Sequence, residues 1–291
     1  MRIQTFTVVA GSEACNARCP YCVSRMTPGY DLGAKLPPVN WRNFRIGCQF
    51  AKDHGVSTVL FTGKGEPTLF PEQLTEFLER LQPFAFPFAE LQTNGIAIAK
   101  QQPVTEKHLQ AWYGLGLTLV ALSIVHWRAE RNKEIYQPDA AAYYDLAALI
   151  ERLHTTGLSV RLSCMLARGY IESPEGVDEL ARFAREHGVE QLTVRSIEKP
   201  RKSESDAVAQ WVTDHALPAD TITKMRGYLD AQGTRVMELA HGAIVYDYRG
   251  QNVCLNNCLT IDPQDERIRQ LIFFPDGHLR YDWQYPGAIL L

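Results

Sequence analysis

The sequence predicts an α/β fold built around a parallel β-sheet, and three observations lead to this prediction. Strand-like and helix-like patterns alternate through the first two thirds of the 291 residues. The stretch LTLVALSIV (residues 117–125) is apolar almost throughout, as expected of a strand covered on both faces. Several helix patterns begin at a proline or end at a glycine, which are common residues at those positions. This order of elements fits either an open doubly wound sheet or a partial barrel.

Short apolar or alternating runs predict six strands, at residues 4–10, 58–62, 89–93, 117–125, 159–166 and 191–197. Amphipathic patterns between them predict five helices, at residues 41–52, 71–81, 105–113, 140–155 and 174–186. Pro71 and Pro174 suit a first helical turn, and Gly157 and Gly188 suit a helix end. We therefore expect a core domain over residues 1–200.

The chain beyond residue 200 has a different pattern. The polar segment RKSESDAVAQ (residues 201–210) predicts a linker or mobile loop, and a helix is expected at residues 219–231. YRGQ (248–251) and PDGH (275–278) predict hairpin turns between short strands. Residues 201–291 are therefore expected to form a small, β-rich α+β extension.

The bulk composition excludes several classes of protein. Hydrophobic residues make up 45% and charged residues 22% of the chain, which is ordinary for a globular protein. A net charge of -3 does not predict a surface for the phosphate backbone of a nucleic acid, so a nucleic-acid partner is disfavoured. The amino-terminal residues lack the apolar run of a signal peptide, and no stretch approaches the roughly 20 apolar residues that span a bilayer. We expect a cytoplasmic protein without a membrane partner.

Three of the seven cysteines, Cys15, Cys19 and Cys22, lie within eight residues directly after the first predicted strand. In a reducing compartment such clustering favours metal or redox chemistry over disulfides. Closed [4Fe-4S] sites usually have four cysteine ligands, so three would leave one iron open to a non-protein ligand. The alternatives are a zinc site missing its fourth ligand, or a chance cluster of buried cysteines. Zinc sites favour paired two-residue spacings and a nearby histidine, and neither is present here.

This loop, CNARCPYC, resembles the signature of the radical S-adenosylmethionine (SAM) superfamily. Polar residues and glycines at the ends of the following strands agree with the resemblance, because ligands of α/β proteins bind at that edge of the sheet. Each has an ordinary structural alternative: a tight turn for the glycines and the Asn-Gly pair, a core hydroxyl for the serine. The resemblance implies that the following residues contact SAM: Tyr21, Gly63, Gly65, Glu66, Gln92, Thr93, Asn94, Ser123, His126, Arg195 and Ser196.

What the resemblance implies is a partial (βα)6 TIM-like barrel of the radical SAM type, with the β-rich extension covering its mouth. Its cofactors would be a [4Fe-4S] cluster on Cys15, Cys19 and Cys22, and SAM. Reductive cleavage of SAM would give a 5′-deoxyadenosyl radical that abstracts hydrogen from a small-molecule, nucleotide-like substrate. The electron would come from an external donor of the flavodoxin or ferredoxin type. Two alternatives stay open: radical modification of a ribosomal peptide, and a non-catalytic iron–sulfur or zinc redox sensor.

Residues 160–200 resemble one member of the superfamily in particular, the GTP cyclase of molybdenum-cofactor biosynthesis. By this match Arg161 stands in place of a basic phosphate-binding residue; a surface arginine at a strand edge is the alternative. The C-terminal part departs from the cyclase, which has three cysteines there for a second cluster. Here only Cys254 and Cys258 remain, and two cysteines cannot saturate a four-iron cluster. A second cluster completed by other ligands, a redox-active pair and buried or vestigial thiols all stay open.

Overall fold

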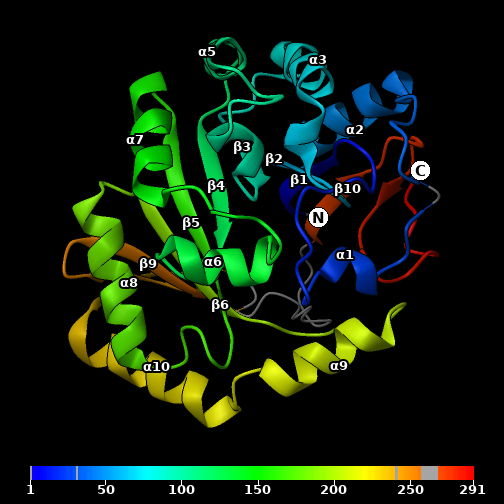
Figure 1. Ribbon diagram of the computed structural model, residues 1–291. Helices are drawn as coiled ribbons and strands as arrows, with labels where there is room; N and C mark the ends of the chain where they lie inside the picture. The colour runs from blue at the N-terminus through cyan, green and yellow to red at the C-terminus, as the bar shows by residue number, and fades with distance from the viewer. Residues whose placement is uncertain (1, 31, 240–241, 257–267) are drawn as a thin grey trace.

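The computed structural model describes residues 2–30, 32–239, 242–256 and 268–291, and eleven strands in these ranges form one continuous sheet (Figure 1). Its strand order is β11-β10-β1-β2-β3-β4-β5-β6-β9-β8-β7. The strands are β1 (Ile3–Val9), β2 (Thr58–Thr62), β3 (Phe88–Thr93), β4 (Leu119–Ile124), β5 (Ser159–Leu166), β6 (Gln191–Ser196), β7 (Thr234–Glu238), β8 (Ile244–Tyr248), β9 (Gln251–Asn256), β10 (Ile268–Phe273) and β11 (Leu279–Arg280).

The middle of the sheet is parallel. All neighbouring pairs from β10 through β1 to β6 and on to β9 run in the same direction. Antiparallel strands close the two edges, with β11 beside β10 and the β8–β7 pair beside β9. This arrangement confirms the α/β partial-barrel prediction with its antiparallel C-terminal strands. The domain division at residue 200 stays a prediction, although strands from both sides of it are hydrogen-bonded in the same sheet.

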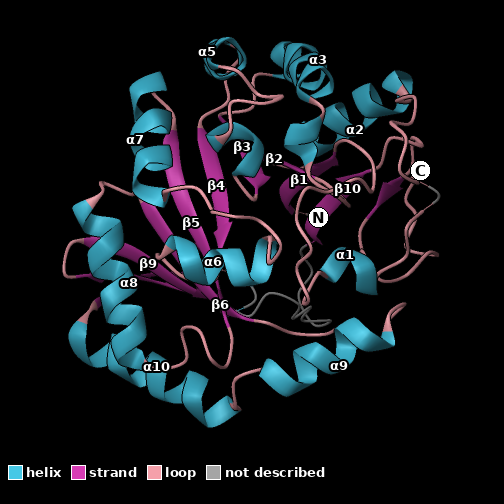
Figure 2. Cartoon of the chain, in the orientation of Figure 1, coloured by secondary structure: helices cyan, strands magenta, loops and turns pink. Residues whose placement is uncertain are grey.

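Helices cover the outer side of this sheet and leave its inner side to the functional site (Figure 2). Along β5, Val160 and Leu162 are fully buried toward the helices, whereas Arg161 between them points the other way. The remaining elements are α1 (Val23–Met26), α2 (Trp41–Asp53), η1 (Pro67–Leu69), α3 (Pro71–Leu81), η2 (Gln82–Phe84), α4 (Ile96–Ala99), α5 (Glu106–Gly114), α6 (Ala129–Tyr136), α7 (Leu146–Thr156), α8 (Pro174–Glu186), α9 (Asp206–His215) and α10 (Ala219–Gln232).

Two local predictions are wrong. The segment expected to be a linker contains the start of α9, because Ser205 caps the helix and Val208 and Val212 supply a buried apolar face. The helix expected from residue 140 begins only at Leu146, where the Asp145 side chain accepts a hydrogen bond from the Ala148 amide at 3.2 Å. The predicted hairpin turns are confirmed by the β8–β9 and β10–β11 pairings. Among the described residues, no helix is long and apolar enough to cross a membrane.

Candidate functional site

A cavity of about 1380 Å³ opens where the carboxyl ends of the parallel strands meet the loops that follow them. Its wall combines the cysteine loop after β1, the loop after β2, the carboxyl ends of β3 and β4, and residues near the C-terminus such as Asp282 and Trp283. Ligand pockets are usually about 300–1,000 Å³, so this cavity has room for more than one small molecule.

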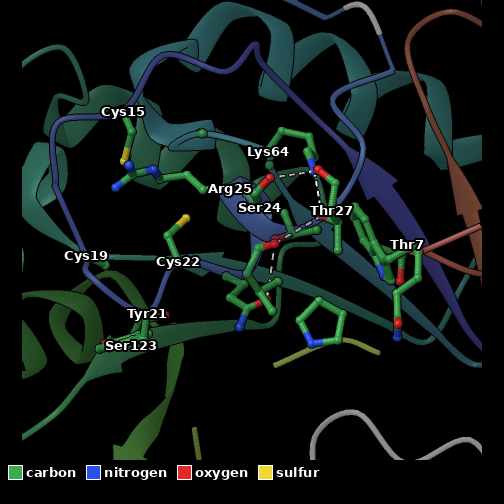
Figure 3. Close-up of a pocket in the computed structure, with 18 of the residues that line it drawn as sticks. Thr7, Cys15, Cys19, Tyr21, Cys22, Ser24, Arg25, Thr27, Lys64 and Ser123 are labelled. Atoms are coloured by element: carbon green, nitrogen blue, oxygen red, sulfur yellow. Dashed lines mark hydrogen bonds between the residues drawn. The ribbon is translucent and has the colours of Figure 1, made fainter. Parts of the chain in front are cut away.

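Cys15, Cys19 and Cys22 all line this cavity, and Figure 3 shows them around the same space. Burial, with smaller contributions from the nearby Glu66 and Cys22, raises the pKa of Cys15 to about 11. Burial also raises the pKa of Cys19 well above its usual value, with Cys22 and Cys15 as the next causes. The three thiols thus lie near one another, and three soft sulfur donors at one cavity fit an iron–sulfur cluster. No three His, Cys, Asp or Glu side chains among the described residues are grouped so as to hold a single metal ion.

The loop after β2, Gly63-Lys64-Gly65-Glu66, lies directly against the cysteine loop. The Gly65 amide donates to Ser12 O at 3.0 Å, and the Glu66 amide donates to Ala14 O at 2.9 Å. A Cβ atom at Gly65 would lie 2.0 Å from Ala14 O, so only glycine fits this close approach of two backbones. Gly65 is therefore required for the packing of the two loops, whether or not it also contacts a cofactor.

Glu66 is buried in this loop and joins it to the end of β3. Its Oε1 accepts from the Thr68 amide at 3.0 Å and from the Thr68 and Thr93 hydroxyls at 2.6 Å each. Its Oε2 accepts from the Asn94 amide at 2.9 Å. Burial raises the pKa of Glu66, and these hydrogen bonds oppose the rise. Glu66 thus lines the cavity while most of its hydrogen-bonding capacity serves the fold.

The end of β3 supplies three further cavity residues, Gln92, Thr93 and Asn94. Asn94 Nδ2 donates to Asn16 Oδ1 at 2.7 Å, which connects β3 to the cysteine loop. Gln92 Oε1 accepts from the Thr62 hydroxyl at 3.4 Å. The cysteine loop is therefore held by polar contacts from the loop after β2 and from Asn94 at the end of β3.

Of the remaining predicted SAM contacts, Tyr21, Ser123 and Arg195 line the cavity. Tyr21 is partly buried and its hydroxyl donates to Tyr136 Oη at 2.9 Å. His126 and Ser196 are not among the residues that line the cavity. His126 stacks on Trp127 with ring centroids 3.9 Å apart, and burial together with the nearby arginines lowers its pKa to about 4.

Of the residues predicted for substrate or a second cluster, the two that the structure describes, Arg161 and Cys254, do not line the cavity. Arg161 forms an ion pair with the buried Glu90 and is not among the cavity-lining residues. Cys254 is buried on β9, where burial raises its pKa and nearby Arg161 opposes the rise. Cys258 lies outside the described residues. Cys48 and Cys164 are fully buried in the core, as expected for thiols that pack as small hydrophobes.

Several cavity residues were missed from the sequence. Lys64 lies inside the glycine turn that the sequence singled out, and its buried side chain lines the cavity. Arg25 lines the cavity just beyond the last cysteine, and Figure 3 shows its side chain extending toward Cys15. Tyr136 reaches the cavity from α6, a helix that the sequence pattern did not predict. Lys64 and Arg25 could have been found from the sequence, because each is a charged residue inside or beside the glycine or cysteine motif.

Comparison with solved structures identifies the architecture. The chain superposes on anSMEcpe with bound AdoMet at a TM-score of 0.62, with 15% identity, covering 99% of this chain and 77% of that one. For Streptococcus suis SuiB bound to S-adenosylmethionine the TM-score is 0.59, again with 15% identity, covering 99% of this chain and 60% of that one. The chain has the fold of the radical SAM enzymes. Methylornithine synthase (PylB) is a further structural neighbour, with a TM-score of 0.52 and 13% identity over 91% of this chain and 74% of that one.

A curated protein is also similar in sequence. The probable dual-specificity RNA methyltransferase RlmN of Pelodictyon phaeoclathratiforme is 27% identical over 184 residues, which is 61% of this chain and 50% of that protein. This chain therefore spans about half the length of the curated relative it matches and 60% of the length of SuiB. No protein-family profile matches the chain.

Proposed function

We propose that this protein is a radical SAM enzyme that holds a [4Fe-4S] cluster on Cys15, Cys19 and Cys22. The observation that carries the proposal is the convergence of these three thiols on one large cavity at the carboxyl ends of the parallel strands. When bound, the cluster supplies the electron that cleaves SAM to methionine and a 5′-deoxyadenosyl radical, which then takes hydrogen from the substrate. The protein contributes the binding surface, the orientation and the exclusion of water.

The arrangement of residues around the thiols supports this function over a redox or zinc sensor. A sensor needs its metal ligands but no adjoining cavity. Here polar residues at the ends of β3 and β4, Asn94 and Ser123, line a cavity whose volume is larger than one small ligand needs. Tyr21 places an aromatic ring at the same wall, suited to a nucleoside base. The two structural neighbours with bound SAM have the same fold.

Anaerobic reconstitution tests the proposal. The protein should take up about four irons per chain and show broad visible absorption. Addition of SAM and dithionite should then release 5′-deoxyadenosine. Cys22→Ala should lose both properties, whereas Cys48→Ala, a core thiol away from the cavity, should keep them. Zinc in place of iron, or iron without release of 5′-deoxyadenosine, would contradict the assignment.

For the substrate, we infer a small molecule that carries an anionic group, such as a nucleotide. Arg195 lines the cavity, and its Nε donates to Met165 Sδ at 3.1 Å, a weak acceptor. Within the described ranges Arg195 forms no direct ion pair, although its charge lies close enough to lower the pKa of Glu90, the direct partner of Arg161. A guanidinium group available in a cavity is suited to a phosphate or carboxylate. Guanosine triphosphate should therefore increase 5′-deoxyadenosine release by the wild-type protein and not by Arg195→Met.

A peptide substrate is the second candidate. SuiB has been solved bound to its precursor peptide SuiA, and anSMEcpe with bound peptides. In this chain Tyr281 and Tyr285 line the cavity and are about half exposed, at 46% and 48%, so they can contact a larger ligand at its mouth. A peptide that increases 5′-deoxyadenosine release in both the wild type and Arg195→Met would favour this alternative. Either reaction needs an external electron donor, for which a flavodoxin or ferredoxin remains our proposal.

A further inference from the structure

Lys64 is a buried lysine for which the proposed chemistry has so far given no role. Only 5% of the residue is exposed, and its ammonium group is fully engaged by protein oxygens. Lys64 Nζ donates to Ser24 O at 2.9 Å, to Thr27 O at 3.1 Å and to the Thr27 hydroxyl at 2.7 Å (Figure 3). A buried lysine is rare in proteins unless such partners compensate it.

All three acceptors belong to the segment that follows the last cysteine. Cys22 is the residue before α1, and Ser24 and Thr27 lie in and directly after this short helix. A four-residue helix has little stability of its own, so its place depends on outside contacts. Lys64 supplies them from the loop after β2, at the end of the helix where a cation is favoured.

The same loop already holds the other side of the cysteine loop. Gly65 and Glu66 donate their amides to Ser12 and Ala14, which precede Cys15. Three consecutive residues thus bind the chain before the first cysteine and after the last one. Removing the Lys64 contacts would release only the second of these two attachments.

The charge of Lys64 also lies within electrostatic range of Cys22. Burial lowers the pKa of Lys64 to about 8, and the negative charges of Cys22, Glu13 and Glu204 oppose this lowering. At neutral pH the amine therefore remains largely protonated. A cation near a cluster stabilises the reduced form, which carries one more electron.

We propose that Lys64 is a positioning residue, which fixes the arm of the cysteine loop that follows Cys22 and places a positive charge beside the bound cluster. This inference rests on the proposed function, because it needs a cluster on Cys15, Cys19 and Cys22. The role proposed for Lys64, which lies between Gly63 and Gly65, does not require contact with SAM or substrate.

The test compares Lys64→Met, Lys64→Gln and Lys64→Arg in the full chain after anaerobic reconstitution. Lys52→Met is the matched control, since Lys52 also donates to a backbone carbonyl, Phe84 O at 2.5 Å, but does not line the cavity. The measurements are iron per chain, the rate of cluster loss to a chelator, the midpoint potential of the cluster, and circular dichroism of the protein before reconstitution. Loss of an orienting partner of a metal site typically weakens binding 10–100-fold, so we expect cluster loss from Lys64→Met to be faster by roughly tenfold or more.

The expected pattern is graded. Lys64→Gln, which keeps donors but not the charge, should hold its cluster better than Lys64→Met and have a lower midpoint potential than the wild type. Lys64→Arg should recover most of the potential. Equal midpoint potentials and equal rates of cluster loss in all variants would overturn the proposal. Loss of the native circular dichroism in all three Lys64 variants would also overturn it, because Lys64 would then stabilise the fold as a whole. Failure of the wild type itself to bind iron would instead refute the proposed function.

Discussion

Substitution of Gly65 by alanine tests how closely the cysteine loop depends on the loop after β2. The added Cβ would lie 2.0 Å from Ala14 O and 2.7 Å from the carbonyl carbon of Glu13, both backbone atoms that no side-chain rotation can move. Ordinary contacts begin at 3.4 Å, so the two loops must separate by more than one ångström. Overpacking of this kind costs about 1–3 kcal/mol.

The separation also weakens two backbone hydrogen bonds, from Gly65 to Ser12 O and from Glu66 to Ala14 O. Each such bond contributes about 0.5–1.5 kcal/mol, so the whole substitution should lower the free energy of unfolding by roughly 2–6 kcal/mol. Because the strain falls on the residues just before Cys15, the iron content after reconstitution should fall together with the stability.

Urea denaturation and iron analysis measure these two effects. Gly227→Ala is the matched control, because nothing lies within 4 Å of a Cβ at Gly227 in α10. That substitution should leave the iron content unchanged and raise the stability by up to about 1 kcal/mol through helix propensity. If Gly65→Ala unfolds at the wild-type urea concentration and binds the same amount of iron, the proposed close packing of the two loops is wrong.

Three further predictions follow from buried polar groups and a helix cap. The pKa of Glu66 is raised in the folded protein, so its contribution to stability is greatest below its unfolded pKa of 4.5 and falls as the pH rises through the folded pKa. The stability of Glu66→Gln, measured by urea titration, should therefore depend less on pH than that of the wild type. A difference in stability between the two proteins that does not vary with pH would contradict this. Arg161→Met should lower the free energy of unfolding by about 3–5 kcal/mol, because it leaves the buried Glu90 without its ion-pair partner. The additional change Glu90→Gln should recover most of this free energy. Additive losses in a double-mutant cycle would refute the pairing. Asp145→Ala removes the N-terminal cap of α7 and should lower the free energy of unfolding, measured by heat or urea, by about 1 kcal/mol. An unchanged stability would contradict the start of α7 at Leu146.

The fold was predictable where residues with fixed backbone preferences mark the element ends. The helices that begin at Pro71 and Pro174 have the predicted bounds, since proline suits the first turn and its ring excludes an earlier helical residue. By contrast, α9 was missed because its polar first residues hide a narrow apolar stripe. The parallel pairing of β10 with β1, which joins Ile268 to Ile3, was also beyond prediction. Local periodicity contains no information about such a distant neighbour.

The site divides in the same way. The grouping of the three cysteines at one cavity followed from their spacing after a strand, because the five residues between them cannot carry them far apart. The partners of Glu66 did not follow, since Thr93 approaches it only when β2 and β3 pair in the observed register. Likewise the stacking of His126 on Trp127 turns a predicted cofactor contact away from the cavity lining, and nothing in the spacing of residues 123–126 indicates that turn.

The contacts of the loop after β2 change how its sequence should be understood. A glycine-rich turn ending in a carboxylate suggests a surface shaped for a ligand, with the carboxylate facing it. In this structure Gly65 is required by the backbone of Ala14, and Glu66 is held by Thr68, Thr93 and Asn94. The turn therefore orders the cysteine loop and the end of β3 at the same time. Since both elements border the cavity, binding of cluster and of SAM would each depend on the same few hydrogen bonds, and weakening either loop should weaken both.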